Sequence, residues 1–336
     1  MLVDGGIGSD LRAAASSARK AEEAGYDAIW SAETGHDPLM PLLLAAEHTE
    51  RITLGTAIVV AFGRSPMTLA NQGWDLNAYS GGRLILGLGS QIKPHIERRY
   101  SMPWSHPAPR MREFISAMRA IWDCWQNGTK LDFRGEFYTH TLMTPFFHPG
   151  PSEFGAPKVF LAAVGEGMTR VAAEVADGLL VHGFTTERYL REVTVPTVES
   201  VLVANGRSLA DFQFSYPAFV VTGDSEKEMD EAERGTRKQI AFYASTPAYR
   251  PVLELHGWGD LQPQMNALSK QGQWDEMGAL ITDEILDAFA VRGAPEEVPT
   301  LLHQRFGDIV DRISLYMPYD DQGVAPRILA GLRDLH

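Results

Sequence analysis

The feature that most constrains the fold is a repeated alternation of short strand-like segments with longer helical ones. Eight segments are short and apolar or rich in β-branched residues: MLVDG, DAIWSAE, ITLGTAIVV, RLILGLG, KVFLAAVG, LLVHGF, FQFSYPAFVVTGD and DRISLYMP. Most of them are followed by a helical pattern, and such βα units imply parallel strands with right-handed crossovers. The sequence therefore predicts an α/β fold, and eight units favour a single (β/α)8 TIM barrel over an open doubly wound sheet.

Caps and apolar periodicity mark the helices between these strands. Ser9 or Asp10 is placed to cap the first helix, and Gly25 to end it. The segment from Arg110 to Trp125 is amphipathic, and residues 225–305 are mostly helical in pattern. The stretch FRGEFYTHTLMTPFFHPGP interrupts the alternation and predicts an excursion with the character of a hairpin.

Composition limits the class of protein. No break in composition divides the 336 residues, so we expect one domain over residues 1–336 with insertions at the C-terminal strand ends. Thirty Lys and Arg against 43 Asp and Glu give a net charge of −13, which argues against nucleic acid or anionic lipid as partner. One cysteine, no signal-peptide pattern and no apolar run of ~18 residues predict a cytoplasmic protein that does not enter a membrane.

In a closed barrel the chemistry lies at the C-terminal ends of the strands. The second strand ends near Glu33, His36 and Asp37, which could handle protons or hold a polar ligand. The alternative is that Asp37 caps the next helix and His36 is merely solvated. His182, at the end of the sixth strand, could also point into the pocket.

Small residues follow the fourth strand. Gly87 and Gly89 leave room for a ligand, which Ser90 and Gln91 could hydrogen-bond. The run does not complete the Gly-x-Gly-x-x-Gly pattern, because Ile92 occupies its last position, so a dinucleotide fingerprint is poorly supported. In the third strand, Gly-Thr-Ala before Ile58 allows either a bulge or an ordinary buried strand.

The fifth strand runs through AAVGEGMTR directly into a helix. Free backbone amides at a helix N-terminus form an anion site, and Gly165 and Gly167 remove side-chain obstruction there. A tight βα turn is the alternative. No metal motif and no Gly-x-Ser-x-Gly elbow is present, so neither a metal site nor a hydrolase is expected, and Cys124 has a structural position on the amphipathic helix.

Taken together, five motifs in this order resemble the bacterial luciferase-like superfamily, in its branch that uses the deazaflavin coenzyme F420. They are AEEAGYDAIWSAET, ITLGTAIVVAF, LILGLGSQIKPHIERRY, RMREFISAMRAIW and VGEGMTRVAAEVADG. The resemblance implies a TIM barrel whose pocket holds the coenzyme, with its flat ring against a bulge in the third strand. It also implies a non-prolyl cis peptide at Ala57–Ile58 and a homodimer. The turn that holds the coenzyme phosphate would consist of Val164, Gly165, Glu166, Gly167 and Met168.

The resemblance also implies an activity. We expect hydride transfer between the deazaflavin and an unidentified small organic substrate, with Glu33, His36 and Gln91 as catalytic candidates. Thr34 and Ile92 depart from residues found in the sugar-phosphate dehydrogenases of this branch, which puts a glucose-6-phosphate substrate in doubt. The alternatives are an FMN-dependent monooxygenase of the same fold and a non-catalytic flavin-binding barrel.

Overall fold

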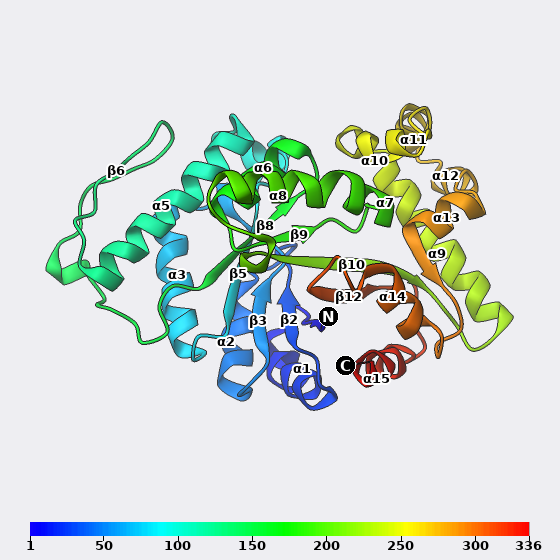
Figure 1. Ribbon diagram of the computed structural model, residues 1–336, viewed down its shortest axis with the longest axis horizontal. Coiled ribbons are helices and arrows are strands. Elements are labelled where there is room, and N and C mark those ends of the chain that lie inside the picture. The colour runs from blue at the N-terminus through cyan, green and yellow to red at the C-terminus, as the bar shows by residue number, and fades with distance from the viewer. Residues whose placement is uncertain (336) are drawn as a thin grey trace.

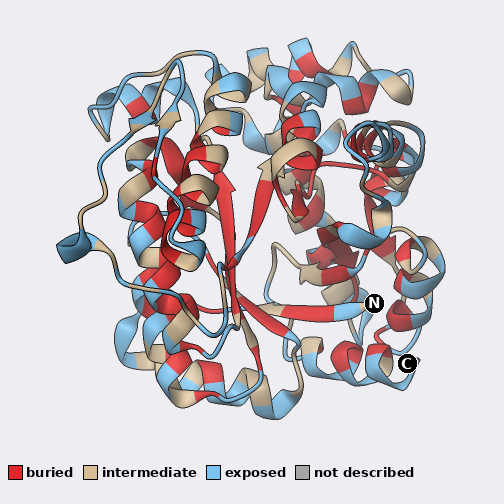
Figure 2. Cartoon of the chain, turned by 60° about the vertical axis from the view of Figure 1, so that its left-hand side comes forward, coloured by how far each residue is buried: buried red, intermediate tan, exposed pale blue. Residues whose placement is uncertain are grey.

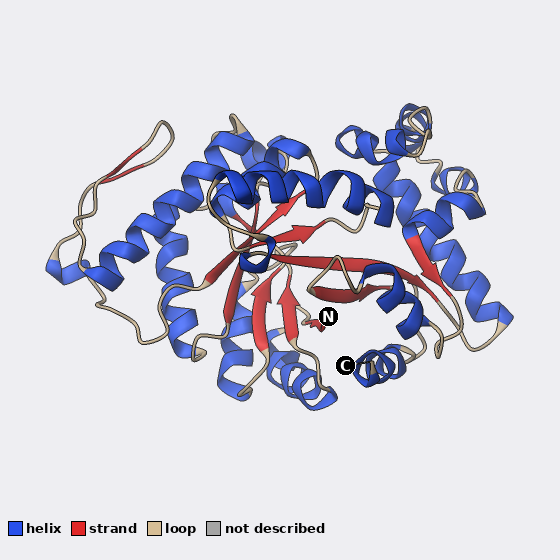
Figure 3. Cartoon of the chain, in the orientation of Figure 1, coloured by secondary structure: helices blue, strands red, loops and turns tan. Residues whose placement is uncertain are grey.

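Eight parallel strands close into a barrel in the computed structural model, which describes residues 1–335 (Figure 1 and Figure 3). Each strand pairs with two neighbours, and the last pairs with the first. In order around the barrel they are β1 (Leu2–Gly6), β2 (Ala28–Ser31), β3 (Thr53–Thr56), β5 (Leu84–Gly89), β8 (Lys158–Ala163), β9 (Gly178–Val181), β10 (Gln213–Val221) and β12 (Arg312–Tyr316). The predicted TIM barrel is confirmed, and each predicted strand segment supplies one of its strands.

Helices surround the strands, and buried residues concentrate on the strands and on the helix faces turned toward them (Figure 2). The helices are α1 (Leu11–Ala24), α2 (Leu39–His48), α3 (Pro66–Tyr79), α4 (Lys93–Arg98), α5 (Pro107–Asn127), α6 (Glu166–Val175), α7 (Glu187–Tyr189), α8 (Val195–Ala204), α9 (Glu226–Ala244), α10 (Arg250–Leu255), α11 (Leu261–Lys270), α12 (Trp274–Ala279), α13 (Asp283–Phe289), α14 (Val298–Phe306) and α15 (Ala325–Asp334). Asp10 caps α1 and Gly25 ends it in the left-handed conformation, as predicted. No helix of residues 1–335 is long and apolar enough to span a bilayer.

One short separate sheet and one extra strand of the main sheet lie outside the ring of eight strands. The predicted hairpin is confirmed: β6 (Phe133–Arg134) and β7 (Thr139–His140) pair antiparallel and project from the body (Figure 1). The segment β11 (Ala290–Arg292) pairs with the end of β10. We predicted mostly helix there, and the strand was missed because three residues show no period of their own.

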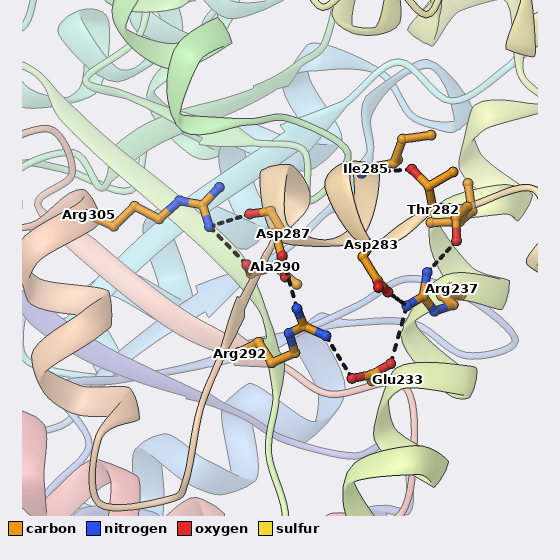
Figure 4. A network of polar contacts seen from close by, with 10 residues as sticks. Glu233, Arg237, Thr282, Asp283, Ile285, Asp287, Ala290, Arg292 and Arg305 are labelled. Carbon is orange, nitrogen blue, oxygen red and sulfur yellow. Dashed lines mark hydrogen bonds and ion pairs between the residues drawn. The ribbon is translucent and has the colours of Figure 1, made fainter.

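A polar network joins the helices that follow β10 (Figure 4). Arg292 donates to Glu233 of α9 at 2.9 Å and to Asp287 of α13 at 3.0 Å. Arg237 of α9 donates to Glu233 at 3.2 Å and also pairs with Asp283 of α13. These contacts fix α9 against α13 and β11, and the C-terminal end of α9 forms one wall of the site described below.

The third barrel strand is not continuous, so the structure has the bulge that the resemblance implied and not the ordinary buried strand that the residues of ITLGTAIVV also allowed. It breaks after Thr56, the Ala57–Ile58 peptide is cis as expected, and β4 (Val59–Val60) then pairs with β5. The Thr56 hydroxyl donates to the Gly87 carbonyl at 2.8 Å and accepts from the Gly87 amide at 2.9 Å. A β-carbon at residue 87 would lie 1.8 Å from the Thr56 carbonyl oxygen. Only glycine fits there, so the Gly-x-Gly of β5 is the space into which the bulge folds.

Gly87→Ala tests this close approach. Overpacking costs about 1–3 kcal/mol, and we expect the upper end, about 3 kcal/mol, because the new methyl group meets backbone rather than a movable side chain. Urea unfolding measures the change in the free energy of unfolding. Gly8→Ala is the matched control, since a β-carbon there meets nothing within 4 Å. Equal midpoints for the two variants would contradict the steric account.

Candidate functional site

A cavity of about 690 Å³ opens at the C-terminal ends of the barrel strands, where the barrel rule predicts a site. We call it the basin. Its lining residues are Ala57, Ile58, Gly89, Ser90, Gln91, Ile92, Ala162, Ala163, Val164, Gly165, Met168, Leu180, Val181, His182, Gly183, Pro217, Tyr243, Thr246, Ala248, Tyr249 and Tyr316. Its volume lies within the range of about 300–1,000 Å³ that small-molecule and cofactor sites occupy.

Small and apolar side chains form one side of the basin. The bulge presents Ala57 and Ile58, and Ala162 and Ala163 at the end of β8 also lie on the wall. Gly89 completes this side, and a β-carbon there would lie 2.8 Å from the Ile58 side chain. The wall thus carries apolar side chains, most of them small, and no polar side chain, which suits a flat ring.

The N-terminus of α6 forms a second part of the rim. Gly165 precedes the helix in extended conformation, and no side chain caps the first turn. A β-carbon at Gly165 would meet nothing within 4 Å, so the space beside the start of α6 is open. Free amides at a helix N-terminus favour an anion. Gly165 and Met168 line the basin, whereas Glu166 and Gly167 do not.

Aromatic residues also line the basin, and His182 lies among them. Its ring contacts those of Tyr243 and Tyr249, with centroids 4.7 Å away in both cases. The Phe184 amide donates to Nδ1 at 3.0 Å, so the proton of the neutral ring is on Nε2, 3.2 Å from the Tyr249 hydroxyl. Burial lowers the pKa of His182 to about 4. The histidine is therefore uncharged at neutral pH.

Glu33 is placed behind the bulge rather than in the basin. Its carboxylate accepts hydrogen bonds from the Val60 amide at 2.8 Å, from Arg64 at 2.7 Å and from the Tyr100 hydroxyl. Arg64 also donates to Asp37 at 2.8 Å. Burial, together with the bond to Glu33, raises the pKa of Tyr100. The structure thus gives Glu33 the role of anchoring the bulge to the end of β2.

The other predicted site residues divide between the basin and its surroundings. His36 is exposed, and Asp37 accepts from the Leu39 amide at 2.8 Å, the capping role that we gave as its alternative. Gly87 lies beneath the bulge. Sequence reasoning missed Tyr243 and Tyr316, because α9 and β12 carry no motif that marks a site and only the closure of the barrel brings them to the other strand ends.

Comparison with known proteins decides the family. A family model described as luciferase-like monooxygenase matches residues 2–312. The chain belongs to this family. The resemblance found in the sequence is thereby confirmed.

Named relatives of this luciferase-like protein include enzymes. An uncharacterised protein of Mycobacterium tuberculosis strain H37Rv is 56% identical over 313 residues, covering 93% of this chain and 92% of that protein. A 5,10-methylenetetrahydromethanopterin reductase of Archaeoglobus fulgidus is 28% identical over 287 residues, covering 83% of this chain and 81% of that one. The solved coenzyme F420 dependent tetrahydromethanopterin reductase from Methanopyrus kandleri shares the fold with a TM-score of 0.78 and 21% identity, over 98% and 96% of the two chains.

Glu33→Gln tests the anchoring of the bulge in this luciferase-like protein. Breaking a buried ion pair costs about 3–5 kcal/mol. Because Arg64 keeps Asp37, we expect the lower end, about 3 kcal/mol, in the free energy of unfolding. Glu97→Gln is the control, since the Lys93–Glu97 pair is exposed and its loss changes stability by less than about 1 kcal/mol. A Glu33 variant as stable as the control would remove the anchoring role.

The buried His182 gives a pH dependence of stability. Below pH 6.5 the unfolded chain binds a proton on His182 that the folded chain binds only near pH 4. The free energy of unfolding therefore falls as the pH drops from 6.5 to 4, by about 3 kcal/mol from this group alone. In His182→Asn, which keeps an acceptor for the Phe184 amide, this fall should be absent. Chemical unfolding between pH 4 and 7 measures it, with His36→Asn as the exposed control; equal slopes in wild type and His182→Asn would contradict the prediction.

Proposed function

We propose that this protein is a coenzyme F420-dependent oxidoreductase that transfers a hydride between the deazaflavin and a small organic substrate. The observation that carries the proposal is the pairing of two features in one basin. An apolar wall at the bulge suits a flat ring, and open amides at the α6 N-terminus suit a phosphate. Relatives with names that state F420 dependence or methylenetetrahydromethanopterin reduction support the same class of reaction.

The residues present fit such a coenzyme. Ala57, Ile58 and Gly89 would hold the ring, and the α6 turn with Val164 and Gly165 would hold the phosphate. When bound, the deazaflavin supplies a ring carbon that accepts or donates a hydride. The chain itself contributes orientation and a slot with apolar walls, which is how proteins generally use such cofactors.

The three catalytic candidates receive different roles in this proposal. Gln91 lines the basin, and its side chain is the candidate for polarising the substrate. Glu33 is a positioning residue that acts through the bulge. His36 is exposed and lies outside the basin lining, so we assign it no contact with a substrate bound there. Homodimerisation remains a prediction from the resemblance.

Titration of the apoprotein with coenzyme F420 and with FMN tests the proposal against the monooxygenase alternative. Quenching of tryptophan fluorescence is the readout, because Trp30 lines a chamber that adjoins the basin. We expect submicromolar binding of coenzyme F420 and weaker binding of FMN. Submicromolar binding of FMN with no response to coenzyme F420 would overturn the proposal. Persistence of the reduced coenzyme through a broad panel of electron acceptors would favour a non-catalytic binding protein.

Gly165→Asp tests the anion site in the same titration. The space around Gly165 is open and the residue precedes α6, so aspartate can cap the helix without a clash. Its carboxylate would repel a phosphate at the same amides, and we expect coenzyme affinity to fall by about tenfold or more. Gly165→Asn offers the same cap without charge and serves as the matched control. Equal coenzyme affinities of the two variants would contradict the placement of the phosphate at the α6 N-terminus.

A further inference from the structure

A second chamber of about 360 Å³ adjoins the basin between β1, β10 and β12. We call it the side chamber. It shares Ala57, Leu180, Val181, Pro217 and Tyr316 with the basin, so the two cavities are direct neighbours. Its other lining residues are Asp4, Gly5, Gly6, Tyr26, Trp30, Ser215, Ser314, Leu315, Met317 and Ala325. A ligand in the side chamber would therefore lie directly beside one in the basin.

Among residues 1–335, no Asp, Glu, Lys or Arg without a charged partner lines the basin or the side chamber. Within residues 1–335, no Asp, Glu, Lys or Arg lines the basin. In the side chamber, the carboxylate of Asp4 accepts from Arg312 at 2.7 and 2.8 Å and from the Trp30 indole at 2.8 Å, so both of its oxygens are engaged. His182 is neutral near pH 7 because burial lowers its pKa. A charged group that entered the side chamber would lose its hydration and find no free counter-charge there, which is strongly unfavourable.

A pair of tyrosine hydroxyls stands where the two chambers meet. The hydroxyl of Tyr243, from α9, lies 2.9 Å from that of Tyr316, from β12. Only one of the two protons is used between them, so the other is left to donate toward the cavity. Burial and the bond to Tyr243 raise the pKa of Tyr316, which keeps the Tyr316 hydroxyl protonated. Stacking on Phe219, with ring centroids 4.6 Å apart, holds the Tyr316 ring in place.

We propose that the side chamber takes the reacting end of an uncharged substrate with a carbonyl or hydroxyl oxygen, and that this oxygen accepts a hydrogen bond from the Tyr243–Tyr316 pair. The hydride chemistry of such a substrate rests on the function proposed above. The recognition of the substrate does not rest on that function, because the walls and hydroxyls that would bind it are side chains of this chain and need no cofactor. Ser215 and Ser314 add two further hydroxyls to the same chamber.

Three probes of similar size test this recognition on the full chain without cofactor: acetophenone, benzoate and ethylbenzene. Saturation-transfer NMR measures their dissociation constants. We expect acetophenone to bind at least tenfold more tightly than benzoate, since only benzoate carries a charge into the chamber. Tyr316→Phe and Tyr243→Phe should each weaken acetophenone binding by about threefold to tenfold, the effect of one hydrogen bond. Ethylbenzene, which has no oxygen, should bind the variants and the wild type alike.

Tyr79→Phe, at an exposed tyrosine on α3, is the matched control and should leave all three constants unchanged. The proposal is overturned if acetophenone does not bind, if benzoate binds as tightly, or if the Tyr→Phe variants weaken ethylbenzene equally. The last result would show that the hydroxyls only maintain the shape of the chamber. Failure of coenzyme F420 to bind, with these probe results intact, would remove the proposed function and leave the recognition of neutral oxygen compounds standing.

Discussion

The Thr56 carbonyl occupies the place where a β-carbon of residue 87 would stand, and the geometry of the site depends on that close approach. Because Gly87 has no side chain, the third strand can leave the ladder after Thr56 and return as β4. The Thr56 hydroxyl meets both backbone groups of Gly87, so the detour leaves neither of them without a partner. Ile58 is thereby carried to the mouth of the barrel, where it becomes the wall of the basin.

Charge is kept behind this wall rather than in front of it. Glu33 and Arg64 form an ion pair whose side chains are only 6% and 13% exposed, and the Val60 amide adds a further bond. The pair is therefore largely shielded from water, and further hydrogen bonds satisfy its polar atoms. Under these conditions a buried ion pair holds a single geometry. The same separation operates at Asp4, whose charge is met by Arg312. Strong electrostatics thus shape the backbone while the surfaces that a ligand meets stay neutral.

The barrel and the rim of the site could be predicted from local sequence patterns, but the centre of the site could not. The eight strands were predictable because apolar, β-branched segments alternate with capped helices, and the helix start at Gly165 follows from its glycines. The residues alone left the break at Thr56 undecided, because ITLGTAIVV has the propensity of a continuous strand and only the approach of Gly87 interrupts it; the bulge was expected from the family resemblance. The anchoring of Glu33 required knowledge that Arg64 and Tyr100 converge on it. The Tyr243–Tyr316 contact joins residues 73 apart in the sequence, and no local pattern encodes it.

The basin and the side chamber differ in the ligands that they can hold. This difference would determine which of two bound molecules occupies which end. The open amides of α6 favour a negative charge at the rim, whereas the side chamber offers hydroxyls and a neutralised carboxylate. A phosphate-bearing cofactor and an uncharged substrate would therefore sort to opposite ends without any large conformational change. Under the proposed function, discrimination among substrates would then fall to the walls that α9 and β12 supply, because Tyr243 and Tyr316 carry the hydroxyls that face each other there.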